Sequence, residues 1–147
     1  MKKVVVHVYP LLWVYLVWQL LSVATGCSAA LSVVISGSME PQIKRGDLLF
    51  AVGPDRGDEL RPGDIVLYRL PHRPEIPIVH RIIDVVPPSP QTADASRSSL
   101  LEVQYLTKGD ANKVDDRGLV APSYPSGLVP KAAILGASPL PHRLLLA

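Results

Sequence analysis

Residues 63–86 read GDIVLYRLPHRPEIPIVHRIIDVV, and this stretch decides the fold class. A short apolar run at 65–68 follows a Gly-Asp pair, and a longer apolar run covers 76–86. Clusters of Gly, Pro and Asp separate the apolar runs of the chain, as turns do. Short apolar runs between turn signals are typical of buried strands, so this stretch predicts two β-strands.

Three further segments extend the pattern on either side. Residues 48–52 (LLFAV) follow another Gly-Asp pair, residues 101–105 alternate apolar and polar side chains as a half-buried strand does, and residues 132–135 form another short apolar run. No helical period follows residue 36, and the 15 prolines of the chain disfavour long helices. We therefore predict a mainly β domain, a small coiled antiparallel sheet, with a flexible Pro/Ser-rich loop at 87–99.

The N-terminal part has a different character, because no Asp, Glu, Lys or Arg occurs between Val4 and Ile35. A transmembrane helix needs about 20 apolar residues, and residues 11–30 fit best, after a short N-terminal segment at 1–10 and with Pro10 in the first turn. A cleaved signal peptide and a buried core helix are the alternatives, although the run is longer than a usual signal-peptide core. Lys2 and Lys3 predict a cytosolic N-terminus, with residues 31–147 across the membrane.

Charge and cysteine content exclude several classes of function. The net charge is +2, and no basic stripe interleaved with aromatic residues indicates a nucleic-acid site. Cys27 is the only cysteine, which excludes an internal disulfide and a Cys-x-x-Cys metal site. We expect it to be a buried structural thiol. No metal, nucleotide or other cofactor is indicated.

Three segments supply side chains that could perform chemistry together. They contain Ser38 in a turn just after the apolar run, His80 within an apolar strand, and the aspartates Asp110 and Asp116 in a polar turn. Each alone has an ordinary explanation, as a turn serine, a core histidine or a solvated turn. Together they provide the hydroxyl, imidazole and carboxylate of a Ser-His-Asp arrangement, in which a base activates the serine.

The motifs also support a family assignment. SGSMEP, RGDLLF, GDIVLYRL, IPIVHRI and YLTKGDANKVDDRGL occur in this order within residues 31–119, and they resemble the signal peptidase I family. Bacterial members carry a lysine where this chain has His80. The histidine makes the chain similar to the endoplasmic reticulum and archaeal type, and especially to the catalytic subunit of the eukaryotic signal peptidase complex.

The resemblance implies a membrane-bound serine endopeptidase that removes N-terminal signal peptides after small residues. It implies Ser38 as nucleophile, His80 as general base and Asp116 as the acidic partner, with Asp110 as the alternative or an additional support. The Ser36 hydroxyl, with the Ser38 backbone N–H, would form the oxyanion hole. The expected location is the endoplasmic reticulum membrane, or an archaeal plasma membrane, with precursor proteins and accessory subunits of a complex as partners.

Several alternatives stay open at this point. A substrate peptide can add as a strand to an exposed sheet edge, and the candidate edges are residues 46–50 and the segment before His80. Two other functions stay open, a catalytically silent membrane subunit and a self-cleaving regulator with a Ser-Lys pair, although no lysine occupies the position of His80. Family members commonly continue past residues 131–136 into another hydrophobic stretch, whereas this chain ends at Ala147.

Overall fold

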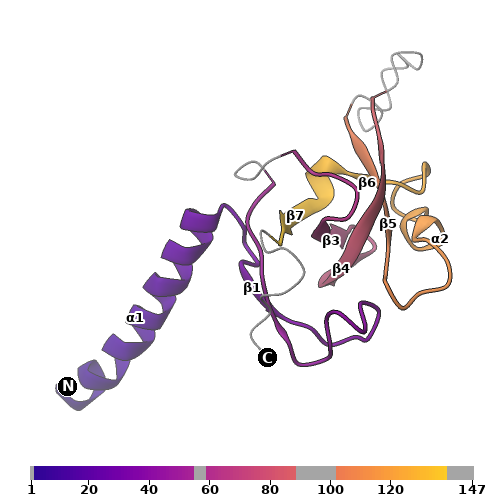
Figure 1. Cartoon of the computed structure of the whole chain (residues 1–147). Helices are drawn as coiled ribbons and strands as arrows, with labels where there is room; N and C mark the ends of the chain where they lie inside the picture. Colours follow the sequence, from indigo (N-terminus) through magenta and orange to yellow (C-terminus); the bar gives the residue numbers. More distant parts are fainter. Residues whose placement is uncertain (1, 55–58, 89–101, 139–147) are drawn as a thin grey trace.

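The computed structural model shows a long helix that projects from a small β domain (Figure 1). It describes residues 2–54, 59–88 and 102–138, with side chains described from Val8 onward. The elements, in chain order, are α1 (Lys2–Thr25), β1 (Leu31–Val33), β2 (Leu48–Phe50), β3 (Ile65–Leu70), β4 (Arg73–Val86), β5 (Gln104–Lys108), α2 (Arg117–Val120), β6 (Val129–Pro130), the 3-10 helix η2 (Lys131–Ala133) and β7 (Ile134–Ala137).

Helix α1 contains a segment that is long and apolar enough to cross a membrane. This segment is Val8–Thr25, of 18 residues. All side chains of residues 8–20 are exposed, which argues against a buried core helix, because a core helix packs its apolar side chains inside the protein. The helix begins at Lys2, so Pro10 lies inside it and not in the first turn as expected.

The helix ends earlier than the predicted span of 11–30. Gly26 follows Thr25 with a φ of 66°, the left-handed conformation that commonly ends helices at a glycine. The backbone N–H of Gly53 donates to the Thr25 carbonyl at 2.9 Å. Cys27 and Ala30 are buried, at 1% and 0% exposure. Residues 26–30 therefore belong to the β domain, and the prediction of a buried Cys27 thiol is confirmed.

A five-stranded antiparallel sheet in the order β6-β5-β4-β3-β7 forms the centre of the domain. Its strand β3 is buried on both faces, which explains its continuous apolar sequence. Val66, Tyr68 and Leu70 belong to one core cluster, and Ile65 and Leu67 belong to a second. Leu49 of β2, and Ala30 and Val34 on either side of β1, belong to the second cluster. The sheet thus has a core on each side, and the predicted mainly β, antiparallel fold with one N-terminal apolar helix is confirmed.

Some details differ from the sequence-based predictions. The predicted strands at 48–52, 65–68 and 76–86 correspond to β2, β3 and β4, but the alternating strand at 101–105 is wrong: the strand is β5, and its first four residues are all buried. As an inner strand paired with both β4 and β6, β5 has no solvated face.

The apolar run at 132–135 is divided between η2 and β7, and β1 and β6 were not predicted. After residue 36, the described helices are only α2 and η2. All of the 87–99 loop except its first two residues lies outside the described residues.

Candidate active site

Ser38 lies in the turn that follows β1. The Glu40 N–H closes the turn by donating to the Gly37 carbonyl at 3.2 Å. Met39, within the turn, is fully buried in the second core cluster and anchors the turn to the domain. The Ser38 side chain is half-buried and that of Ser36 is exposed. Their Oγ atoms are 3.3 Å apart and share a hydrogen bond. The turn therefore presents two hydroxyl groups side by side.

A second turn, formed by residues 109–112, contacts the first. The Ala111 N–H donates to the Ser38 carbonyl at 2.9 Å. A Cβ atom added to Gly109 would lie only 2.7 Å from the same carbonyl oxygen. Glycine is required here because the two backbones approach too closely for a side chain. The polar turn noted in the sequence thus fixes the backbone position of Ser38.

His80 and Asp116 form the central polar pair of the site. His80 lies on β4, where it opposes Val66 of β3, and Asp116 directly precedes α2. His80 Nδ1 is 2.6 Å from Asp116 Oδ2, and both side chains are buried. An ionised carboxylate only accepts hydrogen bonds, so Nδ1 carries the proton and Nε2 of the neutral ring is the acceptor. No hydrogen bond to Nε2 occurs among the described residues, so the histidine is oriented as a base toward its second nitrogen.

Two further side chains, which the sequence analysis did not identify, contact the same carboxylate oxygen. Thr107 Oγ1 lies 2.7 Å from Asp116 Oδ2, and the Tyr68 hydroxyl lies 3.3 Å from it. Burial and the neighbouring Asp116 charge raise the pKa of the Tyr68 phenol well above its ordinary value. Tyr68 also contacts His80 edge-to-face, with ring centroids 6.4 Å apart. Tyr68 lies in an apolar run and Thr107 is an uncharged polar residue, so nothing in the sequence indicated that either contacts Asp116.

Asp110, the other candidate partner of His80, is engaged elsewhere. Arg81 Nε is 2.9 Å from Asp110 Oδ1, and Arg81 Nη2 is 2.7 Å from Asp110 Oδ2, a bidentate pair. The hydrogen bonds that the Arg81 guanidinium donates to Asp110 raise the pKa of Arg81. The same guanidinium donates to the Gly63 carbonyl at 2.7 Å and to the Gln42 side chain. Arg81 therefore connects the polar turn, the segment after Ser38 and the turn before β3.

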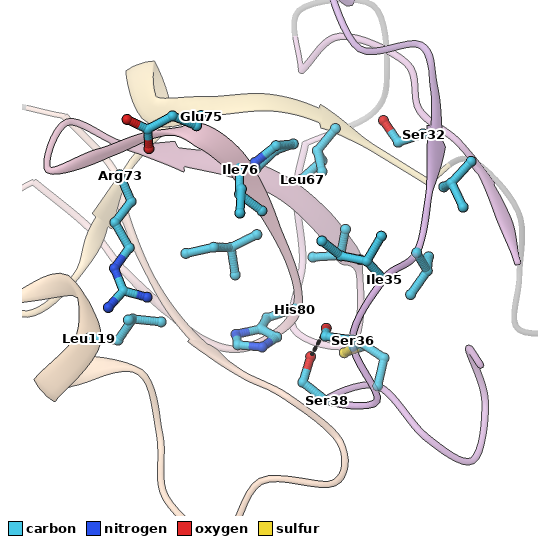
Figure 2. A pocket seen from close by; sticks show the side chains of 16 residues that line it. Ser32, Ile35, Ser36, Ser38, Leu67, Arg73, Glu75, Ile76, His80 and Leu119 are labelled. Carbon is cyan, nitrogen blue, oxygen red and sulfur yellow. Dashed lines mark hydrogen bonds between the residues drawn. The ribbon is translucent and has the colours of Figure 1, made fainter. Parts of the chain in front are cut away.

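A cavity of about 720 Å³ brings Ser36, Ser38 and His80 together. One wall is the β1 side of the domain, residues 32–36, and the other is the first half of β4, residues 73–80. Figure 2 shows the His80 ring facing the two serine hydroxyls across this space. Among the described residues, no hydrogen bond joins His80 to Ser38. Residues 46–50, one of the two expected substrate edges, do not line this cavity, because β2 lies on the far side of β1 from it.

Comparison with known proteins identifies the family. The sequence model described as signal peptidase, peptidase S26, matches residues 5–88, more than half of the chain. The chain belongs to the signal peptidase, peptidase S26, family. The part of this chain that matches the S26 family includes Ser36, Ser38 and His80, whereas Asp110 and Asp116 lie beyond it.

Curated relatives agree with this assignment. The chain is 44% identical over 104 residues to the signal peptidase complex catalytic subunit SEC11C of Homo sapiens and of Mus musculus, which covers 71% of this chain and 48% of each relative. It is 44% identical over 109 residues to the catalytic subunit SEC11 of Ajellomyces capsulatus (strain H143), covering 74% of this chain and 57% of that relative. This S26 chain thus spans about half the length of the curated relatives it matches.

Proposed function

We propose that this chain is the catalytic subunit of a signal peptidase, a membrane-bound serine endopeptidase that removes N-terminal signal peptides after small residues. The observation that carries the proposal is the position of Ser38 and His80 on one cavity, with the other nitrogen of His80 bonded to the buried Asp116. The names of the S26 relatives support the same activity.

In the proposed mechanism, His80 takes up one proton and gives it back in each half-reaction. Ser38 Oγ attacks the scissile carbonyl carbon while His80 Nε2 accepts the hydroxyl proton. The imidazolium is stabilised by Asp116 through the Nδ1–H bond. When the C–N bond breaks, His80 returns the proton to the leaving amine, and the signal peptide remains as an ester on Ser38. Water then attacks that ester while His80 accepts its proton. As the ester C–O bond breaks, His80 returns this proton to Ser38 Oγ, and the signal peptide leaves with a free carboxylate.

Ser36 is proposed to stabilise the oxyanion together with the backbone N–H of Ser38. Its hydroxyl lies 3.3 Å from the nucleophilic oxygen, close to where the negative charge would develop. Removing one oxyanion donor commonly costs about 100- to 1,000-fold in rate. We expect Ser36→Ala to lower kcat for precursor cleavage by this factor, with little change in KM. An equal loss in Ser32→Ala, a serine that lines the same cavity and bonds to Ala29, would contradict this role.

The walls of the cavity suit an extended peptide. β5 pairs with β4 only from Arg81 onward, so the first half of β4 lacks a β5 partner on that side. A substrate strand placed there would lie between β4 and residues 32–36 and pass Ser38 and His80. The apolar lining includes Ile35, Leu67 and Val79, which favours small uncharged side chains at the cut.

Gly109 gives a test of how strictly Ser38 must be positioned. Alanine at this position would force the Ser38 carbonyl to move, because its Cβ would lie 2.7 Å from that oxygen. A displacement of about 1 Å can cost about 100-fold in rate, so we expect a loss of that order in Gly109→Ala. The matched control is Gly118→Ala, since nothing lies within 4 Å of a Cβ there. Cleavage by Gly109→Ala at the rate of the control would contradict this account.

We propose that the protein acts in the endoplasmic reticulum membrane, with a cytosolic N-terminus and the β domain in the lumen. Lys2 and Lys3 precede the apolar helix and support this orientation. The names of the relatives support assembly with accessory subunits of a signal peptidase complex.

The direct test is cleavage of a secretory precursor by the full chain, in membranes that contain the accessory subunits but lack any other catalytic subunit. The expected result is a product shortened by the signal peptide, with its new N-terminus directly after a small residue. A precursor that stays intact, although the complex assembles, would instead favour a catalytically silent subunit.

A further inference from the structure

Asp116 is a buried carboxylate without a positive partner of fixed charge. Its side chain is 4% exposed, and among the described residues His80 is its only ion-pairing partner. Arg117, the next residue, points to Asp115 and not to Asp116. Burying a carboxylate is costly unless hydrogen bonds replace its hydration. Neutral donors must therefore replace much of the hydration that this side chain loses on burial.

The donors are unusually concentrated on one atom. Oδ2 of Asp116 receives His80 Nδ1 at 2.6 Å, Thr107 Oγ1 at 2.7 Å and the Tyr68 hydroxyl at 3.3 Å. Thr107 Oγ1 also lies 3.3 Å from the Tyr68 oxygen, but a hydroxyl has a single proton. The shorter contact assigns that proton to Asp116. Tyr68 keeps its own proton, because burial and the Asp116 charge oppose its ionisation.

We infer that Thr107 and Tyr68 are positioning residues that hold the Asp116 carboxylate in one orientation, and so keep the His80 proton on Nδ1. This inference rests on the proposed function in so far as it concerns the reaction rate. Both residues come from inner strands, β5 and β3, and both are buried. The rigid sheet therefore places two donors on the side of the carboxylate that faces the histidine.

The orientation of the Asp116 carboxylate matters for the reaction because it determines which nitrogen of His80 carries the proton. If the carboxylate turned, His80 would lose its acceptor at Nδ1, and a proton on Nε2 would face the cavity. A ring in that tautomer cannot accept the Ser38 proton. Loss of a donor should thus lower kcat and leave substrate binding unchanged, because neither Thr107 nor Tyr68 lines the cavity.

The test uses Thr107→Val and Tyr68→Phe, which keep the side-chain shape and remove only the hydroxyl. Hydrogen bonds to charged groups contribute about 1.5–3 kcal/mol, so we expect kcat to fall about 10- to 100-fold in Thr107→Val. A smaller loss, about 3- to 10-fold, is expected in Tyr68→Phe because its contact is longer. Thr107→Ser should restore most of the rate. Tyr105→Phe, a buried tyrosine of the same core cluster, is the matched control and should cleave as wild type does.

A second readout separates the inference from the proposed function. The full chain, labelled with 15N-histidine in detergent micelles at a pH where the imidazole is neutral, reports the His80 tautomer, and His80→Gln identifies its signals. We expect the Nδ1–H form to dominate in wild type and in Tyr105→Phe, and to lose population in Thr107→Val and Tyr68→Phe. An unchanged tautomer in both variants would overturn the inference, whatever the activity. A changed tautomer in a chain that cleaves no precursor would support the inference and refute the proposed function.

Discussion

Replacing Ser38 with alanine is expected to reduce precursor cleavage by at least about 10,000-fold, to a level set by the remaining binding and oxyanion contacts. The variant removes the only hydroxyl that combines three properties among the described residues. It is half-buried on the cavity, its backbone is held by Ala111, and it faces His80 (Figure 2). The change deletes one oxygen from a half-buried side chain, so the fold should be unaffected.

The control for Ser38→Ala is Ser32→Ala, measured on the same precursor and in the same membranes. Ser32 lines the same cavity, but its hydroxyl bonds to the Ala29 carbonyl at 3.2 Å. It should cleave within about twofold of wild type, as expected for a surface substitution away from the reacting groups. If Ser38→Ala retained the rate of this control, the assignment of the nucleophile would be wrong.

Asp116→Asn is expected to lower kcat by about 10,000-fold, whereas Asp110→Asn should cost about 10-fold or less. An asparagine at 116 can turn its amide toward His80 and donate to Nδ1, which leaves the ring with its proton on Nε2. Changes of this kind leave the geometry intact and remove the base. Asp110 instead pairs with Arg81, and an asparagine there still offers one oxygen to the guanidinium.

The comparison of these two variants decides between the aspartates that the sequence left open. The thermal unfolding of both variants should also be measured. Arg81 connects three segments, so loss of its partner Asp110 would lower the unfolding temperature. A large loss of kcat in Asp110→Asn with wild-type unfolding would mean that Asp110, and not Asp116, supports the histidine during the reaction.

The sequence predicted the central strands well because their signal is local. Strands β3 and β4 coincide with local apolar runs, and a Gly-Asp turn precedes β3; β3 is almost wholly buried, whereas β4 is mostly half-buried or exposed. It failed at β5, where polar Gln104 and Thr107 are buried. Their burial depends on β6 and on the carboxylate of Asp116, which are distant in sequence, so alternation alone placed the strand a few residues too early.

The candidate site was predictable in its residue types and not in its pairing. Ser38 and His80 stand out because each is a polar side chain with an adjacent apolar segment. The family resemblance implied Asp116 as the partner of His80, but the residues themselves do not distinguish it from Asp110, since both lie in one polar turn. Arg81 decides which aspartate is available to His80, because its guanidinium forms an ion pair with Asp110. Thr107 and Tyr68 were missed for the same reason, because only the three-dimensional sheet brings them to one carboxylate.

The junction between α1 and the β domain has a consequence for the choice of substrates. Thr25 is bonded directly to Gly53, and Cys27 is packed against Gly136, where a Cβ would lie 3.0 Å from its sulfur. Helix α1 and the domain are thus joined without a free tether, so packing fixes the position of Ser38 relative to the apolar helix. Under the proposed function, a precursor whose apolar segment ends too deep or too shallow would present the wrong peptide bond. The protein would then select its substrates by length as well as by the size of the side chain before the cut.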